Sequence, residues 1–261
     1  MFTREQLTDQ IRAMGIAPSD TVLIHTSLRA VGSVEGGADG LIDAFLAALP
    51  DGLFLVPTHT WANVNRKQPV YDVSATVPCI GAVPRAAALR SDGVRSLHPT
   101  HSIWAAGKGA EDFLRGEETA ATPAPPGYAW SRLADAGAKI LLIGVGHDKN
   151  TFIHSLDEAA DLPDRLHPQP YEVTILGRGG ETFRHPFTGH FCSRSPDVSR
   201  QYVNFETPLT ELGAQKRGRL GNADVRIVDA ARCRQIILSI YARADRDLCI
   251  QRQEIPPELY R

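Results

Sequence analysis

Lys139–Val145 reads KILLIGV, one of three short apolar runs in this 261-residue chain. The run is too short for a helix of ordinary length, and every residue after Lys139 is apolar or glycine. Such a run is typical of a strand buried on both faces, as in a parallel sheet. The other two runs are TVLI at Thr21–Ile24 and LFLV at Leu53–Val56. Together they predict three buried central strands.

Helical patterns separate these runs. Thr3–Met14 opens with a Thr-x-x-Gln capping box and stops at Gly15, and Leu41–Leu49 is apolar at helical spacing. Later segments predict three further strands and a closing helix, at Val173–Leu176, Thr182–Phe187, Val225–Val228 and Ala230–Ala244. The alternation predicts an α/β fold with a mostly parallel central sheet. Eight regular strand–helix units are not visible, which argues against a TIM barrel.

We expect a single domain over residues 1–261, because the chain shows no internal repeat and no low-complexity linker. A chain of this length buries about three-quarters of its surface on folding, so its core needs no metal or disulfide. Residues 64–128 are rich in Pro and Gly, which predicts a loop-rich region. This region either contributes to an active site or lies on the surface without a function. Residues 177–204 form a candidate small subdomain, an excursion from the main sheet.

Composition excludes several classes of protein. The net charge is −2 and no Lys/Arg block occurs, so neither a nucleic acid nor a membrane is an expected partner. The N-terminus is charged, and no apolar run is long enough for a transmembrane helix. The cysteines form no C-x-x-C pair, which predicts free thiols in a reducing, cytoplasmic setting, at Cys79, Cys192, Cys233 and Cys249.

Polar residues follow each predicted central strand. His25 follows the first, Thr58, His59 and Thr60 follow the second, and His147 and Asp148 follow the third. In open α/β sheets, ligands bind beyond the carboxyl ends of the strands. The pattern predicts one site at that edge, although any one of these residues alone is better explained as a solvated strand end.

A glycine-rich loop follows His25, with glycines at positions 32, 36, 37 and 40. Glycine lets a backbone approach a ligand closely, and the next helix start attracts phosphate or carbonyl oxygens. The loop has neither the phosphate-loop nor the dinucleotide-binding pattern, so a plain turn is the alternative. A second segment, RSLHPTHS at Arg95–Ser102, combines an arginine, hydroxyls and imidazoles that suit a phosphate or a carbonyl. His98 and His101 are spaced H-x-x-H, but a metal site needs a further ligand, so we expect no metal.

The third segment is NTFIHSLDE at Asn150–Glu158. On a helix, His154, Asp157 and Glu158 share one face at i, i+3 and i+4. A carboxylate beside an imidazole holds its tautomer and stabilises its cation, as a general base requires. The alternative is a solvated polar face, because the apolar residues of the segment point to the opposite side.

Four motifs, in this order and spacing, resemble the aminoglycoside 3-N-acetyltransferase family: DTVLIHTSLRAVGSVEGG (Asp20–Gly37), LFLVPTHTW (Leu53–Trp61), VRSLHPTHSIWAAG (Val94–Gly107) and ILLIGVGHDKNTFIHSLDEAADLP (Ile140–Pro163). The resemblance covers most of the chain. It implies a three-layer α/β/α sandwich, an antibiotic-resistance acetyltransferase that uses acetyl-coenzyme A as cosubstrate and no metal. It implies direct transfer to the 3-amino group of an aminoglycoside, by a monomer or homodimer.

The resemblance also implies site residues. His154 is the expected general base, and the family's glutamate three residues on is Asp157 here, with Glu158 beside it. His25 is expected beside the acetyl group, and backbone N–H groups of residues 25–31 are expected to stabilise the oxyanion. Coenzyme A is expected to contact Ser27, Leu28, Val31, Gly32, Arg95, Ser96, His98 and Ser102. The acceptor is expected to contact Thr60, Asp72, Asp148, Glu158 and His190.

One departure concerns the acceptor. Aminoglycosides are polycations whose pockets need carboxylates, yet residues 63–67 read NVNRK and residues 187–189 read FTG where relatives are acidic. A different amine is therefore a second candidate acceptor. Three alternatives also stay open. The first is an acyl-enzyme on Cys192, and the second is a hydrolase in which the same His/Asp pair activates water, with Ser27 or Ser102 as a candidate nucleophile. The third is a coenzyme A- or sugar-binding module without turnover.

Overall fold

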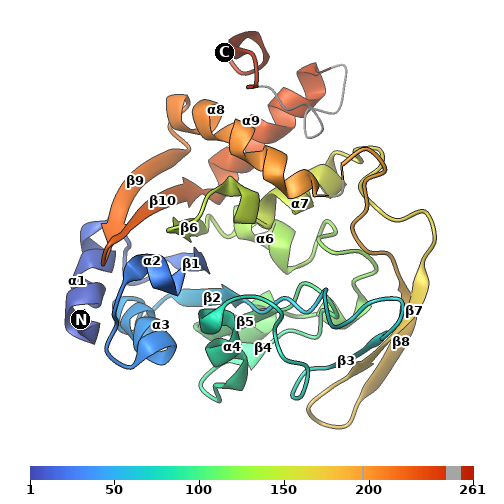
Figure 1. Cartoon of the computed structure of the whole chain (residues 1–261), viewed down its shortest axis with the longest axis horizontal. Coiled ribbons are helices and arrows are strands. Elements are labelled where there is room, and N and C mark those ends of the chain that lie inside the picture. The colour runs from blue at the N-terminus through green and yellow to red at the C-terminus, as the bar shows by residue number, and fades with distance from the viewer. Residues whose placement is uncertain (196, 245–253) are drawn as a thin grey trace.

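The computed structural model describes residues 1–195, 197–244 and 254–261. A mixed seven-stranded sheet runs through the centre of the molecule (Figure 1). Its strands, in spatial order, are β4 (Val94–Arg95), β5 (Ile103–Gly107), β2 (Leu53–Pro57), β1 (Thr21–Thr26), β6 (Lys139–Ile143), β10 (Ala223–Asp229) and β9 (Gln215–Leu220). The three predicted central strands are confirmed as β1, β2 and β6, which lie side by side.

The prediction of a mostly parallel sheet is wrong. β1 pairs in parallel with β2 and β6, whereas β5 on one side and β10 on the other run antiparallel to their neighbours. A continuous apolar run reports burial on both faces of a strand, but it does not report the direction of the strand beside it. β9 and β10 reverse direction through a tight turn at Gly221–Asn222, where Gly221 has a φ of 58°. Of the strands in this sheet, the sequence analysis did not predict β4, β5 or β9.

Helices pack on both faces of this sheet (Figure 1). Side chains alternate along each strand, so Val22 and Leu141 enter one core while Leu23 and Ile140 enter the other. The first core includes α1 (Arg4–Ala13), α3 (Gly37–Ala48) and α4 (Ala82–Leu89), and the second includes α6 (Ala129–Asp135), α7 (Phe152–Ala159) and α9 (Ala230–Arg243). The shorter helices are α2 (Leu28–Val31), α5 (Ala110–Phe113), α8 (Glu206–Glu211) and the 3₁₀ helices Glu117–Thr119, His147–Lys149, Val198–Phe205 and Pro257–Leu259.

The predicted start and stop of the first helix are confirmed. The Thr3 hydroxyl accepts a hydrogen bond from the Gln6 amide, and the Gln6 side chain accepts one from the Thr3 amide. The helix ends before Gly15, whose φ of 83° favours glycine.

A second sheet of three strands lies beside the first and contains β3 (Val70–Asp72), β7 (Tyr171–Leu176) and β8 (Thr182–Phe187). β3 comes from the loop-rich segment 64–128, and it pairs with β7 across about a hundred residues of sequence. Residues 177–204 supply β8 but not its partners. A separate small core, which includes Val64, Tyr71, Val173 and Phe187, holds this sheet together.

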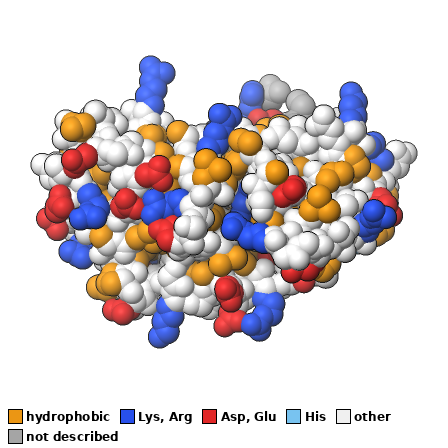
Figure 2. Space-filling view, turned by 90° about the horizontal axis from the view of Figure 1, so that it is seen from below, with side chains coloured by type: hydrophobic (Ala, Val, Ile, Leu, Met, Phe, Trp, Pro, Cys, Tyr) orange, Lys and Arg blue, Asp and Glu red, His pale blue; other side chains and the backbone are white. Residues whose placement is uncertain are grey.

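Cys79, Cys192 and Cys233 are free thiols, while Cys249 lies outside the described residues. Within the described ranges, no helix is long and apolar enough to cross a bilayer. On the face of the molecule shown in Figure 2, acidic and basic side chains are scattered among one another.

Candidate active site

A cavity of about 920 Å³ opens where the central parallel strands end. Its wall includes Thr26 at the end of β1, Pro57 at the end of β2 and Val145 just after β6. This is the edge at which the sequence predicted a site, and the carboxyl ends of neighbouring parallel strands meet there. The volume is in the range of small-molecule sites.

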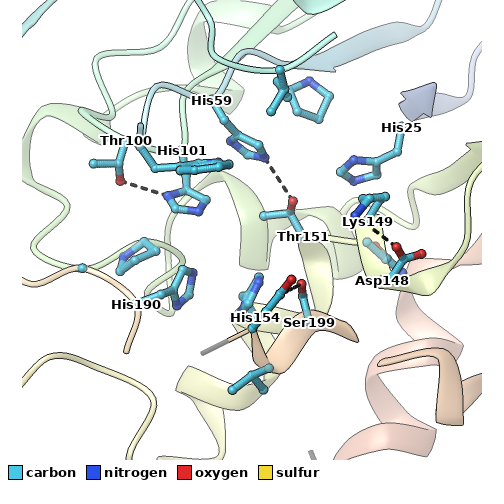
Figure 3. Close-up of a pocket in the computed structure, with 18 of the residues that line it drawn as sticks. His25, His59, Thr100, His101, Asp148, Lys149, Thr151, His154, His190 and Ser199 are labelled. Carbon is cyan, nitrogen blue, oxygen red and sulfur yellow. Dashed lines mark hydrogen bonds and ion pairs between the residues drawn. The ribbon is translucent and has the colours of Figure 1, made fainter. Parts of the chain in front are cut away.

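Histidines from separate segments meet on this wall (Figure 3). They are His25 at the end of β1, His59 after β2, His101 before β5, His154 on α7 and His190 after β8. Ring centroids are 4.0 Å apart between His154 and His190, 5.0 Å between His101 and His190, and 4.7 Å between His59 and His101. The fold thus gathers side chains that lie far apart in the sequence.

These imidazoles are neutral at physiological pH. Burial lowers the pKa of His25 and of His154 to about 3, because the charged form loses hydration there. Burial also holds the pKa of His59, His101 and His190 well below the usual value, and the neighbouring rings add to the effect. A neutral imidazole carries both a lone pair and an N–H group.

Several ring nitrogens have no partner among the described residues although they are buried. They are Nε2 of His25, Nδ1 of His59 and Nε2 of His190. The other nitrogen of His59 lies 3.0 Å from the Thr151 hydroxyl (Figure 3). Buried polar atoms are normally hydrogen-bonded, so the unpartnered nitrogens indicate a place for a ligand.

His154 is connected to a buried carboxylate through a tyrosine. Its Nδ1 lies 2.8 Å from the Tyr202 hydroxyl, which donates a hydrogen bond of 2.7 Å to Oδ2 of Asp157. The hydroxyl has a single proton, so its oxygen accepts from Nδ1–H of His154. This assigns the Nδ1–H tautomer, which leaves the lone pair on Nε2.

Asp157 is 1% exposed and accepts further hydrogen bonds from buried groups. Arg165 Nε lies 3.0 Å from Oδ2, and the Tyr241 hydroxyl lies 2.5 Å from Oδ1. Burial raises the pKa of Asp157, while Arg165 and the two tyrosines act in the opposite direction. The network holds the carboxylate in place behind His154.

Glu158 lies elsewhere. Its carboxylate accepts hydrogen bonds from the Thr122 hydroxyl and, at 2.8 Å, from the Ala124 amide. Burial raises the pKa of Glu158 to about 7. The two neighbouring carboxylates therefore have different surroundings: Asp157 lies behind the imidazole of His154, whereas Glu158 anchors the loop at residues 122–124.

The residues expected at coenzyme A lie outside the described cavity wall. Ser27 caps α2, Val31 is fully buried, and a side chain at Gly32 would meet Asn222. The described wall also lacks the other residues expected to contact coenzyme A, which are Leu28, Arg95, Ser96, His98 and Ser102. Their roles in cosubstrate binding stay predictions.

Most of those side chains are occupied within the fold. The Arg95 guanidinium donates to the Thr58 hydroxyl and to the carbonyls of Thr58, Val73 and Thr76. Ser96 accepts from the Ile103 amide, and the Ser102 hydroxyl donates to the Thr58 carbonyl. His98 accepts from the amides of Thr100 and His101 and lies 3.1 Å from the Thr122 carbonyl.

The residues expected at the acceptor are divided. Asp148 and His190 line the cavity, whereas Thr60 is buried with its hydroxyl on the Pro99 carbonyl. Asp72 accepts from the amides of Ser74 and Ala75 in a turn. Within the described residues, no group of His, Cys, Asp and Glu has the arrangement of a metal site.

The sequence analysis missed Arg165, Tyr202 and Tyr241, which surround Asp157. Tyr202 and Tyr241 are 45 and 84 positions from it. No spacing rule connects residues at such separations, so only the fold shows that they meet.

Fold and site together define an α/β enzyme whose ligand cavity lies at the carboxyl ends of parallel strands. The family described as aminoglycoside 3-N-acetyltransferase matches residues 23–241. The chain belongs to this family, and it is an aminoglycoside N(3)-acetyltransferase-like enzyme, so the resemblance seen in the sequence is confirmed.

Similarity to individual members of the family supports the same assignment. Aminoglycoside N(3)-acetyltransferase IV of Salmonella sp. is 30% identical over 249 residues, which cover 94% of this chain and 88% of the relative. Aminoglycoside N(3)-acetyltransferase III of Serratia marcescens is 28% identical, over 88% of this chain and 93% of the relative. A variant of AAC(3)-IVa solved in complex with a gentamicin is 26% identical, with a TM-score of 0.78 over 97% of this chain and 98% of that one. AAC-IIIb, solved with coenzyme A, shares the fold at 23% identity and a TM-score of 0.78, over 91% of this chain and 95% of that one.

Proposed function

We propose that the protein transfers an acetyl group from acetyl-coenzyme A directly to an amine, with His154 as the general base. By family relationship, the first acceptor to consider is the 3-amino group of an aminoglycoside, since a relative was solved with a gentamicin. The observation that carries the proposal is the bridge from Nδ1 of His154 through Tyr202 to Asp157.

Acetyl-coenzyme A suits the cavity by size and chemistry. A cavity of about 920 Å³ is large enough for the reacting end of the cosubstrate. The unpartnered nitrogens of His25 and His59 on the wall suit a carbonyl oxygen, because the N–H of a neutral imidazole can donate to it. When bound, acetyl-coenzyme A supplies the acetyl thioester.

His154 moves the proton. Its lone pair on Nε2 accepts a proton from the acceptor nitrogen as the N–C bond forms, when that nitrogen is most acidic. The imidazolium then donates through Nδ1–H to Tyr202, whose own hydrogen bond reaches the Asp157 carboxylate. Burial lowers the pKa of His154 to about 3, so its cation gives up the proton readily, and the departing thiolate takes that proton up.

Hydrogen-bond donors near the thioester oxygen stabilise negative charge in the transition state. The amides of Ser27, Ala30 and Val31 already bond to carbonyls of the fold, so residues 25–31 have few free donors. A neutral His25 with its proton on Nε2 supplies one, because that atom is buried and has no described partner.

The alternative nucleophiles have weaker support. The Cys192 thiol lies on the cavity wall and donates to the Asp164 carboxylate at 3.4 Å. Ser27 Oγ accepts from the Ala30 amide, and Ser102 donates to the Thr58 carbonyl. None of these described bonds joins the nucleophile to an imidazole, which a nucleophile–base pair requires.

The test is to incubate purified protein with acetyl-coenzyme A, with and without a panel of amines that includes aminoglycosides. Free thiol is measured by a colorimetric reagent, and acetylated product and protein by mass spectrometry. We expect thiol release only with an amine, and no acetylated protein. Release without an amine would indicate a hydrolase, acetylated protein an acyl-enzyme, and binding of coenzyme A without release a binding module.

A further inference from the structure

The charges on the cavity wall bear on which amine it accepts. The carboxylates among the described lining residues are Asp148 and Asp197. Asp148 Oδ2 lies 3.1 Å from Lys149 Nζ (Figure 3), and Asp197 Oδ2 lies 2.9 Å from Arg200 Nε. Each is therefore already paired with a cation of this chain.

The described wall also carries basic residues, and these outnumber its two carboxylates. They are Arg66, Lys149 and Arg165. Arg165 and Lys149 pair with Asp157 and Asp148. Arg66 donates to the carbonyls of Gln169 and Pro170 and lies over the Tyr171 ring, so its partners are neutral groups. The charge left over on the wall is positive.

The remaining candidates for binding an ammonium group are occupied. Asp157 is buried behind His154, and Glu158 accepts from Thr122 and Ala124. The wall histidines His25, His59, His101, His154 and His190 are neutral and contribute no negative charge. On the outer face shown in Figure 2, acidic side chains are dispersed among basic ones and form no continuous patch among the described residues.

We propose that the enzyme's acceptor is an amine on an otherwise uncharged or anionic molecule, and that polycationic aminoglycosides are poor acceptors. The inference rests on the proposed acetyl transfer and names the substrate class of the same cavity. An ammonium group that leaves water without a carboxylate partner loses its hydration, and each additional ammonium group repeats that loss. The apolar wall, with Trp61, Ile80 and Phe191, favours an uncharged body over a charged one.

The test compares two acceptors with the same scaffold and the same reacting group. One is apramycin, and the other is apramycin with every amino group except the 3-amino group capped as a neutral amide. Saturating acetyl-coenzyme A keeps the cosubstrate's phosphate charge the same in both arms. We expect kcat/KM to be at least tenfold higher for the capped compound at low ionic strength. An equal or higher kcat/KM for apramycin would overturn the inference.

Binding separates this inference from the proposed function. Calorimetry at saturating coenzyme A should give a lower Kd for the capped compound, whether or not either compound is acetylated. A lower Kd for apramycin, or no binding of either compound, would overturn the inference. Absence of turnover with both compounds would instead count against the proposed acetyl transfer, and the order of the two Kd values would still decide the acceptor class.

Variants test the cause. Lys149→Gln releases the Asp148 carboxylate, so we expect it to tighten apramycin binding about threefold or more and to leave the capped compound within twofold. Asn65→Asp adds a carboxylate to the wall, while its Oδ1 can still accept from the Lys67 amide, and it should act in the same direction. Lys108→Gln, an exposed residue outside the described wall, is the matched control and should change neither value. If both wall variants leave apramycin binding unchanged, charge is not the cause and the proposal fails.

Discussion

Nδ1 of His154 lies 2.8 Å from the hydroxyl of Tyr202, a residue 48 positions away. The tyrosine in turn donates to Asp157, which the helix places three residues after the histidine. The family resemblance implies a glutamate at this position, which is one methylene longer than Asp157. Here a tyrosine hydroxyl spans the distance from carboxylate to imidazole. The tautomer and orientation of the proposed base therefore depend on Tyr202.

Tyr202→Phe removes the acceptor of Nδ1–H without changing the volume of the ring. We expect kcat to fall about tenfold, a part of what general-base catalysis contributes, while KM for both substrates changes little. Steady-state kinetics measures both values. Tyr241→Phe is the matched control, because Tyr241 also donates to Asp157 but no described bond joins it to His154. Equal losses in the two variants would show that Tyr202 acts only by holding Asp157.

His154→Ala removes the proposed base itself. We expect turnover to fall about 100-fold or more, the usual scale for such a loss. Coenzyme A should still raise the melting temperature of the variant, because ligand binding to the folded state stabilises it by mass action. Thermal shift and turnover are measured on the same preparation. Unchanged turnover at limiting acceptor would rule out His154 as the base.

Asp157→Asn and Glu158→Gln should differ, because the two carboxylates face different surroundings. Asp157→Asn deprives His154 and the buried Arg165 of their carboxylate, so turnover should fall, and breaking the buried pair should cost about 3–5 kcal/mol of unfolding free energy. Glu158→Gln changes a group that anchors Thr122 and Ala124, and turnover should fall less. Urea denaturation and steady-state kinetics check both effects. A larger loss of turnover in Glu158→Gln would contradict this assignment.

Glu117 predicts a pH dependence of stability. It is fully buried, and burial raises its pKa from 4.5 to about 7, with the Ala129 amide donating to Oε1. Between these values the unfolded chain loses the proton while the folded protein keeps it, so stability falls as the pH rises from 4.5 to 7. The total change is about 3 kcal/mol at most.

Glu117→Gln removes this titration, so comparison with it isolates the effect from other ionisable groups. The melting temperature of the wild type, relative to Glu117→Gln, should fall as the pH rises from about 4.5 to about 7. Differential scanning calorimetry at several pH values measures the difference. A constant difference would mean that Glu117 titrates alike in the folded and unfolded states.

The sequence by itself determined the α/β class, the three central strands and the edge at which the cavity opens. Continuous apolar runs require burial on both faces, and parallel neighbours bring their carboxyl ends together, so His25 and the residues after LFLV and KILLI converge. The four motifs determined the family. Helical spacing determined that His154 and Asp157 share a face, because i and i+3 are adjacent on any helix.

Only the tertiary structure decided the direction of the outer strands, the partner of each carboxylate and the charge of the cavity. Strand direction depends on how connections such as the turn at Gly221–Asn222 pack, which burial patterns do not encode. Arg165, Tyr202 and Tyr241 meet Asp157 through long-range packing, and Lys149 neutralises Asp148 through a side-chain conformation. Hydrogen bonds act over about 3 Å, so spacing along a chain constrains them only within one helix or turn.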